Sequence, residues 1–221
     1  MEIKGFLETS FVDWPGKICA VLFLPSCNLR CPFCHNHELV LHPERLSAFP
    51  WNHIQQRLTA LRSWMDGVCI TGGEPTLHPD LPELLSRIHG LGLKVKLDTN
   101  GTRPEMLELL ISKNLIDYLA MDIKGPLDQE SYGWCAGVRI SIPEIKRSMD
   151  FILSAQVPGE FRTTVVPQWH TPPVLARMAL ELAKAPKWTH QEFNPANAMD
   201  PTLSSAGPLL SLNPSGHLMG L

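Results

Sequence analysis

Long hydrophobic runs are missing from this sequence. No segment approaches the roughly 20 consecutive apolar residues that a transmembrane helix needs. The N-terminal segment, MEIKGFLETSFVDWPGK, contains no apolar signal segment either. We therefore expect a cytoplasmic protein, with no membrane among its partners.

An excess of charge of one sign is also missing. Lys and Arg number 19 and Asp and Glu number 22, which gives a net charge of -3 over 221 residues. This balance does not indicate a surface for polyanions, so nucleic acid is not an expected partner. A hydrophobic content of 44% excludes a disordered chain, and the length predicts one domain with or without a tail.

The sequence offers no disulfide framework. Disulfide-rich proteins are small and secreted, whereas this chain is long and carries no export signal. Cys19 and Cys69 lie inside apolar stretches and are expected to be buried, reduced thiols, while the surroundings of Cys135 assign it less clearly. The remaining three fall within eight residues and need another explanation: Cys27, Cys31 and Cys34.

Short apolar runs alternate with longer amphipathic segments along the chain. The predicted strands are residues 18–24, 67–71, 93–98, 117–123, 160–166 and 188–193. The predicted helices are residues 51–64, 80–89, 104–114, 143–155 and 172–184, several with a proline near the first turn (Pro82, Pro104, Pro143 and Pro173). This alternation indicates a parallel sheet buried on both faces. Six repeats are fewer than the eight of a closed barrel, so the pattern allows an open partial barrel or a flat doubly wound sheet.

Polar or glycine-rich motifs follow four of the predicted strands. The cysteine loop follows the first strand, and Gly72-Gly73-Glu74-Pro75 follows the second. Asp98-Thr99-Asn100-Gly101 ends the third strand, and Met121-Asp122-Ile123-Lys124 ends the fourth. The carboxyl ends of parallel strands meet at one rim, so we expect the functional site there.

The cysteine loop has the spacing C-x3-C-x2-C, which can close around one metal centre. Zinc would need a fourth protein ligand, for which His35 or His37 is available. An iron-sulfur cluster held by three cysteines would instead leave one iron open to an external ligand. Structural zinc sites usually bring two separated ligand pairs, and this sequence has no second pair, so the spacing favours the cluster.

The loop CNLRCPFC, with Phe33 before its last cysteine, resembles the signature of the radical S-adenosylmethionine (SAM) superfamily. Further motifs are similar to the anaerobic ribonucleoside-triphosphate reductase activating proteins, which belong with the glycyl-radical-enzyme activating enzymes: DWPGK at 13–17, CHN at 34–36, GGEP at 72–75, DTNG at 98–101, MDIK at 121–124 and RTTVVP at 162–167. The resemblance implies an α/β fold, a partial (β/α)6 TIM-like barrel, over residues 1–195. Residues 196–221 contain one charged residue and no helical period, so we expect an irregular C-terminal tail.

The resemblance also implies the cofactors and the reaction. Cys27, Cys31 and Cys34 would hold a 4Fe-4S cluster, and Gly72, Gly73 and Glu74 would bind the methionine amino group of SAM. The reduced cluster would cleave SAM to methionine and a 5'-deoxyadenosyl radical. The radical would then act on a glycine of an anaerobic reductase, with flavodoxin or ferredoxin as low-potential electron donor. No side chain needs to act as a general base.

Asp98 and Asp122 end apolar strands, where a carboxylate without a partner would be unfavourable. Helix capping by Asp98 or Thr99 is one explanation. The resemblance implies another, in which Asp98, Thr99, the carbonyl of Met121 and Asp122 bind Na⁺ or K⁺ near the SAM carboxylate.

Lys124 and Arg162 lie at or near strand ends, where they could bind the carboxylate or ribose of SAM or form salt bridges. The resemblance favours contact with SAM. Asp13, Trp14 and Gly16 match the segment before the first strand of the activators, although a turn with a buried tryptophan explains them equally.

Other residues and other functions stay open at this point. His170, His190 and Gln191 follow or lie in late strands and either border the site or are ordinary packed residues. The single cysteine triad argues against an auxiliary cluster. A radical SAM enzyme for another glycyl-radical enzyme, a peptide, a nucleoside or RNA is one alternative, and a non-catalytic zinc- or cluster-binding module is another.

Overall fold

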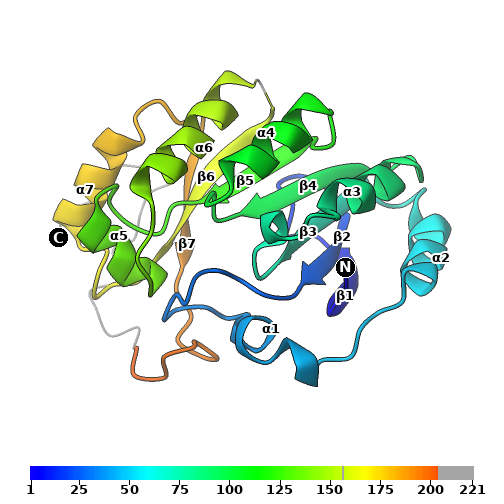
Figure 1. Cartoon of the computed structure of the whole chain (residues 1–221), viewed down its shortest axis with the longest axis horizontal. Coiled ribbons are helices and arrows are strands. Elements are labelled where there is room, and N and C mark those ends of the chain that lie inside the picture. The colour runs from blue at the N-terminus through cyan, green and yellow to red at the C-terminus, as the bar shows by residue number, and fades with distance from the viewer. Residues whose placement is uncertain (156, 204–221) are drawn as a thin grey trace.

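The computed structural model describes residues 1–155 and 157–203. Its centre is a seven-stranded sheet whose strands follow one another in chain order, with β1 antiparallel to β2 and all later neighbours parallel. The strands are β1 Gly5–Ser10, β2 Cys19–Leu24, β3 Gly67–Gly72, β4 Lys94–Thr99, β5 Tyr118–Asp122, β6 Gly159–Val165 and β7 Trp188–Glu192. Figure 1 shows the sheet curving from β1 to β7.

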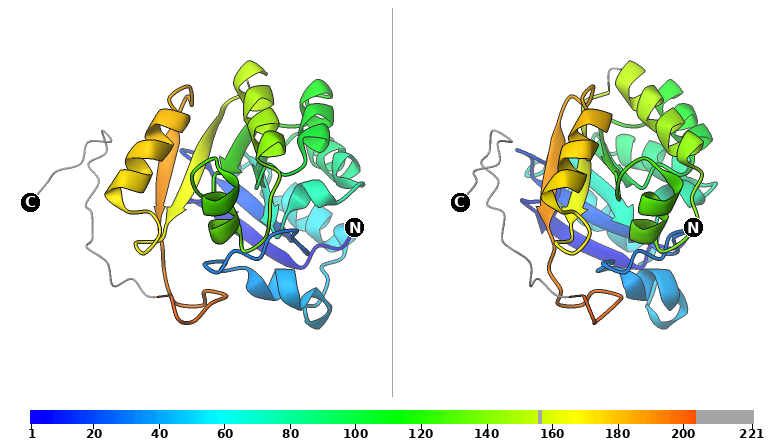
Figure 2. Two further views of the ribbon diagram at one scale, coloured as in Figure 1. Left: turned by 60° about the vertical axis from the view of Figure 1, so that its left-hand side comes forward. Right: turned by 90° about the vertical axis from the view of Figure 1, so that its left-hand side faces the viewer.

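Helices connect the parallel strands. They are α1 His37–Leu41, α2 Trp51–Leu61, α3 Leu81–His89, α4 Pro104–Ser112, α5 Gln129–Ala136, α6 Ile142–Ser154 and α7 Pro172–Glu181, with 3-10 turns η1 Pro43–Arg45 and η2 Pro75–Leu77. Figure 2 shows strands toward one side of the molecule and α4 and α6 toward the other. A doubly wound sheet reverses its strand order at a switch point, whereas this order never reverses, so the fold is an open partial barrel.

The two faces of the sheet are both apolar but differ in size. Ala20, Leu22 and Leu24 of β2 pack into the large core beneath the helices. Cys19 and Val21, which alternate with them, face the barrel interior and join Trp14 and Cys69 in a second, smaller cluster. A strand buried on both faces reads as a continuous apolar run, which is how the sequence CAVLFL predicted β2.

The six parallel strands and the five longer helices agree with the predicted ranges to within a few residues. Each of the four prolines lies in the first turn of its helix, as expected. The sequence did not predict β1, α1 or α5. Strand β1, GFLETS, is an edge strand with one buried residue, so it lacks the apolar run that revealed the others.

The predicted tail lies largely outside the described residues, because the description ends at residue 203. Its described part, 196–203, forms turns and contributes the buried Ala198 to the core. The domain boundary at residue 195 stays a prediction. Within the described ranges, no helix combines the length and the apolar character needed to cross a membrane.

Candidate active site

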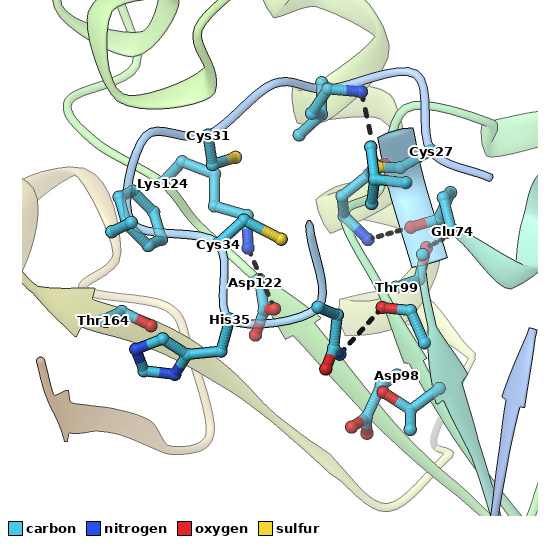
Figure 3. A pocket seen from close by; sticks show the side chains of 18 of the residues that line it. Cys27, Cys31, Cys34, His35, Glu74, Asp98, Thr99, Asp122, Lys124 and Thr164 are labelled. Carbon is cyan, nitrogen blue, oxygen red and sulfur yellow. Dashed lines mark hydrogen bonds and ion pairs between the residues drawn. The ribbon is translucent and has the colours of Figure 1, made fainter. Parts of the chain in front are cut away.

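A cavity of about 420 Å³ opens at the carboxyl ends of the parallel strands, within the size range of small-molecule sites. Figure 3 shows this pocket from close by. Its lining includes all but one of the residues that the sequence singled out for ligands: Cys27, Cys31, Cys34, Gly72, Gly73, Glu74, Asp98, Thr99, Asp122, Lys124 and Arg162. The exception is Met121, for which the predicted ligand is the backbone carbonyl; its fully buried side chain packs toward Gly101.

The backbone of the cysteine loop is held from two directions. The amide of Arg30 donates to the carbonyl of Ala136 at the end of α5 (2.9 Å). On the other side, the amides of Met199 and Asp200 donate to the carbonyls of Cys34 (3.0 Å) and Pro32 (2.8 Å). Segments far apart in the sequence therefore fix a loop that has no regular secondary structure of its own.

The three thiols have few partners within the protein. The amide of Leu29 donates to Cys27 Sγ at 3.3 Å, and Asn100 Nδ2 lies 3.8 Å from the same sulfur. Burial raises the pKa of the Cys27 thiol to about 11 and that of the Cys31 thiol to about 12, and it also raises the pKa of Cys34. Thiols in such a site lose their protons to a metal, because coordination deprotonates them outright. All three line the cavity, where they are available as sulfur ligands.

The donor set fits an iron-sulfur cluster better than zinc. In Figure 3, Cys31 and Cys34 lie beside Lys124, whereas Cys27 lies nearer Glu74. Among residues 1–155 and 157–203, no three His, Cys, Asp or Glu side chains form a group suited to one metal ion. His35 Nε2 lies 2.5 Å from the carbonyl of Asn194, and its ring stacks on Phe193. His35 is thus engaged elsewhere, and His37 Nδ1 lies 3.7 Å from Glu38.

The two glycines of the GGEP motif are required by close packing. A Cβ on Gly73 would lie 1.8 Å from the carbonyl oxygen of Ser26, and Gly72 has φ +120, which side chains rarely adopt. The strand end of β3 thus packs directly on the backbone that leads into the cysteine loop. A side chain on Gly73 would collide with the backbone of Ser26, the residue before Cys27.

Glu74 is buried and fully bonded within the chain. Its Oε1 accepts hydrogen bonds from the amide of Thr76 (3.0 Å) and the hydroxyls of Thr76 (2.5 Å) and Thr99 (2.8 Å), and Oε2 accepts from the amide of Asn100 (2.6 Å). Burial raises the pKa of Glu74 although these donors oppose it. The contact of Glu74 with the SAM amino group remains a prediction. The amino group would have to bind a carboxylate whose hydrogen bonds already link η2 to β4.

The carboxylates of Asp98 and Asp122 lie in a continuous chain of ion pairs across β4, β5 and β6. Lys96 pairs with Asp98, whose other oxygen accepts from Arg162 at 3.2 Å. Arg162 Nε donates to Asp122 Oδ1 at 2.9 Å, and Lys124 Nζ donates to Asp122 Oδ2 at 3.0 Å. Parallel register places Asp122 directly opposite Arg162.

The pKa values in this chain follow from the pairing. Burial would raise the pKa of Asp122, but Arg162 and Lys124 outweigh it and lower the value to about 2. Burial would lower the pKa values of Lys124 and Arg162, but the neighbouring carboxylates raise both. Asp122, Lys124 and Arg162 are therefore charged at neutral pH.

The ion pairs show how Asp98 and Asp122 are stabilised at their strand ends, and this differs from the two explanations that the sequence suggested. Neither Asp98 nor Thr99 caps α4, whose N-cap is Arg103 and lacks a side-chain hydrogen bond. Lys124 and Arg162 form salt bridges, as the simpler interpretation had it, yet they are largely buried and also line the cavity. The monovalent cation has no support here, because both carboxylates already have basic partners. It stays a prediction.

The remaining predicted residues divide between cavity and core. Asp13 and Gln191 line the cavity, whereas Trp14 is buried in the smaller cluster. His170 is buried, accepts from the amide of Val166 at Nδ1 (3.0 Å), and has a lowered pKa because burial disfavours its charged form. His190 packs edge-on against Trp188, and its buried Nε2 has no hydrogen-bond partner among residues 1–155 and 157–203.

Sequence reasoning missed two features of the site. Asn100 Nδ2 donates to Asn28 Oδ1 (3.0 Å), and Asn28 Nδ2 donates to the hydroxyl of Thr102 (2.8 Å), which ties the cysteine loop to the end of β4. Lys96 was also missed. Strand periodicity gave a signal for it, because Lys96 lies two residues before Asp98 and therefore on the same face of β4.

The comparisons with known proteins agree with this geometry. The family model described as "Radical SAM superfamily" matches residues 21–176. This chain belongs to the radical SAM superfamily. Membership implies that a 4Fe-4S cluster and SAM are its cofactors, and it makes the chain an enzyme, so the non-catalytic module is not retained.

Among curated proteins, a Methanocaldococcus jannaschii protein named "Putative glycyl-radical enzyme activating enzyme" is 34% identical over 203 residues, which cover 90% of this chain and 82% of that protein. The pyruvate formate-lyase-activating enzyme of Clostridium pasteurianum is 29% identical over 70% of this chain and 62% of its own length. The chain is thus a radical SAM enzyme that is similar to glycyl-radical activating enzymes.

A solved structure confirms the fold. SuiB of Streptococcus suis, bound to its precursor peptide SuiA, superposes with a TM-score of 0.63 at 21% identity, covering 87% of this chain and 43% of SuiB. This chain therefore spans less than half the length of that protein. The likeness shows that the radical SAM partial barrel is shared.

Proposed function

We propose that this radical SAM enzyme generates a glycyl radical on a large protein, and that the protein is an anaerobic ribonucleoside-triphosphate reductase. The observation that carries the proposal is the 34% identity with a glycyl-radical activating relative over 90% of this chain. The motifs DWPGK, MDIK and RTTVVP direct it toward the reductase.

The residues of the pocket support the proposed chemistry. Cys27, Cys31 and Cys34 would hold the cluster, and the wall of ion pairs below them would face SAM. When bound, the cluster would supply the electron for reductive cleavage of SAM to methionine and a 5'-deoxyadenosyl radical, which would abstract the hydrogen. The chain's own residues bind SAM, hold it beside the thiols and keep water from the reacting atoms. No general base is needed in this scheme.

Two partners follow from the proposal. The reductase would present a glycine-bearing loop to the cavity, and a low-potential flavodoxin or ferredoxin would supply the electron. Phe33 and Lys124, whose ammonium group lies 5.8 Å from the Phe33 ring centre, close one side of the cysteine loop.

The test is anaerobic reconstitution with iron and sulfide, followed by addition of reductant, SAM and a candidate reductase. We expect 5'-deoxyadenosine to form and a glycyl-radical doublet to appear in the electron paramagnetic resonance spectrum of the reductase. A reductase with its target glycine changed to alanine is the control and should give no doublet. Formation of 5'-deoxyadenosine without a doublet on any reductase tested would overturn the assignment of the substrate but not the enzyme class.

A nucleoside or nucleobase substrate is a second candidate. Three 7-carboxy-7-deazaguanine synthases are 34% to 38% identical to this chain over 79 to 94 residues. These matches cover at most 41% of this chain, so they carry less weight than the activating relative. Consumption of a small purine-like compound in place of the radical doublet would favour this candidate.

A further inference from the structure

Lys96 is an unusual residue for its place in the fold. It lies in the middle of β4, and only 1% of its side chain is exposed. A buried lysine is rare unless its ammonium group is paired, because transfer of an isolated charge out of water is very unfavourable. Neither the predicted ligand set nor the proposed reaction uses this residue.

The register of the sheet places Lys96 inside the barrel, below the cavity. It lies opposite Cys69 of β3 and Tyr118 of β5, and its Nζ is 3.6 Å from Cys69 Sγ. The ammonium group pairs with Asp98 Oδ1. Its aliphatic part thus crosses the barrel interior, and its charge meets the first carboxylate of the cavity wall.

The pair between Lys96 and Asp98 determines how the rest of the wall is bonded. Asp98 Oδ2 accepts from Arg162 at 3.2 Å, and Arg162 donates its Nε to Asp122 at 2.9 Å. Each carboxylate therefore has two basic partners, one of them Arg162. Without Lys96, Asp98 would keep Arg162 as its one basic partner, and the guanidinium would be drawn away from Asp122.

We propose that Lys96 is a positioning residue that acts as a built-in cation: it fixes Asp98 against Arg162 in the wall of the SAM pocket, and the pocket therefore binds SAM without an external monovalent cation. The inference rests on the use of SAM as ligand and not on which protein receives the radical. Lys96 itself lies below the lining of the cavity and acts through Asp98 and Arg162.

The proposal makes a specific claim about chemical rescue. Replacement of Lys96 by methionine keeps the length and apolar character of the side chain but removes one positive charge next to a carboxylate. Asp98 lines the cavity, so a small cation can reach it from solvent. Oxygen ligands suit hard cations, so K⁺ or Na⁺ should substitute for the missing ammonium group.

The experiment measures SAM binding to the reconstituted holoprotein with its cluster oxidised, by equilibrium dialysis, in KCl, NaCl or choline chloride at equal ionic strength. We expect wild type to bind SAM equally well in all three salts. Lys96→Met should bind about tenfold more weakly in choline chloride, which corresponds to the loss of one favourable contact, and should recover in KCl or NaCl. Lys94→Met is the matched control, because Lys94 is exposed on the same strand and should change nothing.

A double variant separates positioning from general packing. Lys96→Met with Asp98→Asn removes both charges of the pair, so it should fold, and its SAM affinity should not respond to K⁺. Melting temperatures of the same holoproteins provide a readout that does not require SAM: K⁺ should raise the value for Lys96→Met alone. The proposal is overturned if Lys96→Met matches wild type in choline chloride, if wild type needs K⁺, or if Lys96→Met is weakened but no cation restores it.

Discussion

Two parts of the cavity differ in how their side chains are bonded. One is the cysteine loop, and the other is the charged wall formed by Lys96, Asp98, Asp122, Lys124 and Arg162. The loop presents one buried thiol, Cys31, and two half-buried thiols, Cys27 and Cys34, which have few partners among the described residues. Backbone hydrogen bonds to α5 and to residues 199 and 200 hold the loop. The wall consists of five side chains, each paired with another of the five, and four of them line the cavity while Lys96 lies below it. Thiols without partners indicate a place where a ligand can bind. Side chains that are already ion-paired indicate a surface that is organised before the ligand binds.

The largest expected effect comes from a substitution in the cysteine loop. Cys31→Ala removes one of the three predicted cluster ligands, so reconstituted protein should lose its bound iron and its 5'-deoxyadenosine formation. The loss should exceed the roughly 10- to 100-fold that removal of a mere outer-shell partner costs. Iron analysis and product formation are measured on the same sample. Cys135→Ala, a buried cysteine of α5, is the control and should keep both properties.

Retention of iron and activity by Cys31→Ala would mean that the thiols are structural, like Cys19 and Cys69. The comparison between the two sides of the cavity would then fail. Loss of both properties in Cys135→Ala as well would point to a general folding defect, because Cys135 packs against Gly125 and does not line the cavity.

The second largest effect is expected from a substitution in the charged wall, where it should lower the free energy of unfolding. Arg162→Met leaves Asp98 and Asp122 without their shared partner, and loss of one member of a buried ion pair costs about 3 to 5 kcal/mol of folding free energy. Urea unfolding of cluster-free protein measures the change. Arg177→Met is the matched control, since Arg177 also bridges two carboxylates but is half exposed, and its replacement should cost much less folding free energy. Equal losses in the two variants would show that the wall is no more organised than the surface.

The sequence predicted the loop side better than the wall side, and the reason is physical. Cysteine spacing is local, so CNLRCPFC indicates three candidate ligands without any knowledge of the fold. Alternating apolar runs likewise predicted β2 to β7. Pairing across strands is not local: Arg162 meets Asp122 because of the register between β5 and β6, and no motif encodes that register. Lys96 was missed because its partner Asp98 was interpreted as a ligand.

Acid should weaken the wall in a defined pH range. The pKa of Asp122 is lowered from 3.8 to about 2, so its pairing stabilises the fold above the unfolded value and this contribution is lost as pH falls from about 4 to 2. The shift corresponds to about 2 kcal/mol. Asp122→Asn should remove this part of the pH dependence, which urea unfolding at several acidic pH values will measure. Identical acid profiles for the two proteins would mean that Asp122 gains nothing from Arg162 and Lys124.

The smallest effect is expected for His35, which follows the last cysteine of the loop. This substitution tests directly whether the loop has a fourth ligand. His35 contacts the carbonyl of Asn194 and stacks on Phe193, so His35→Ala should cost about 1 kcal/mol, the value of one ordinary hydrogen bond. For a chain of this size that lowers the melting temperature by roughly 2 to 4 °C. Bound iron should not change, because His35 is held against the strand-end segment and is not a ligand. His37→Ala serves as the neighbouring control. Loss of metal in His35→Ala alone would instead make His35 a fourth ligand, and the loop would then be a closed zinc site with no open position for SAM.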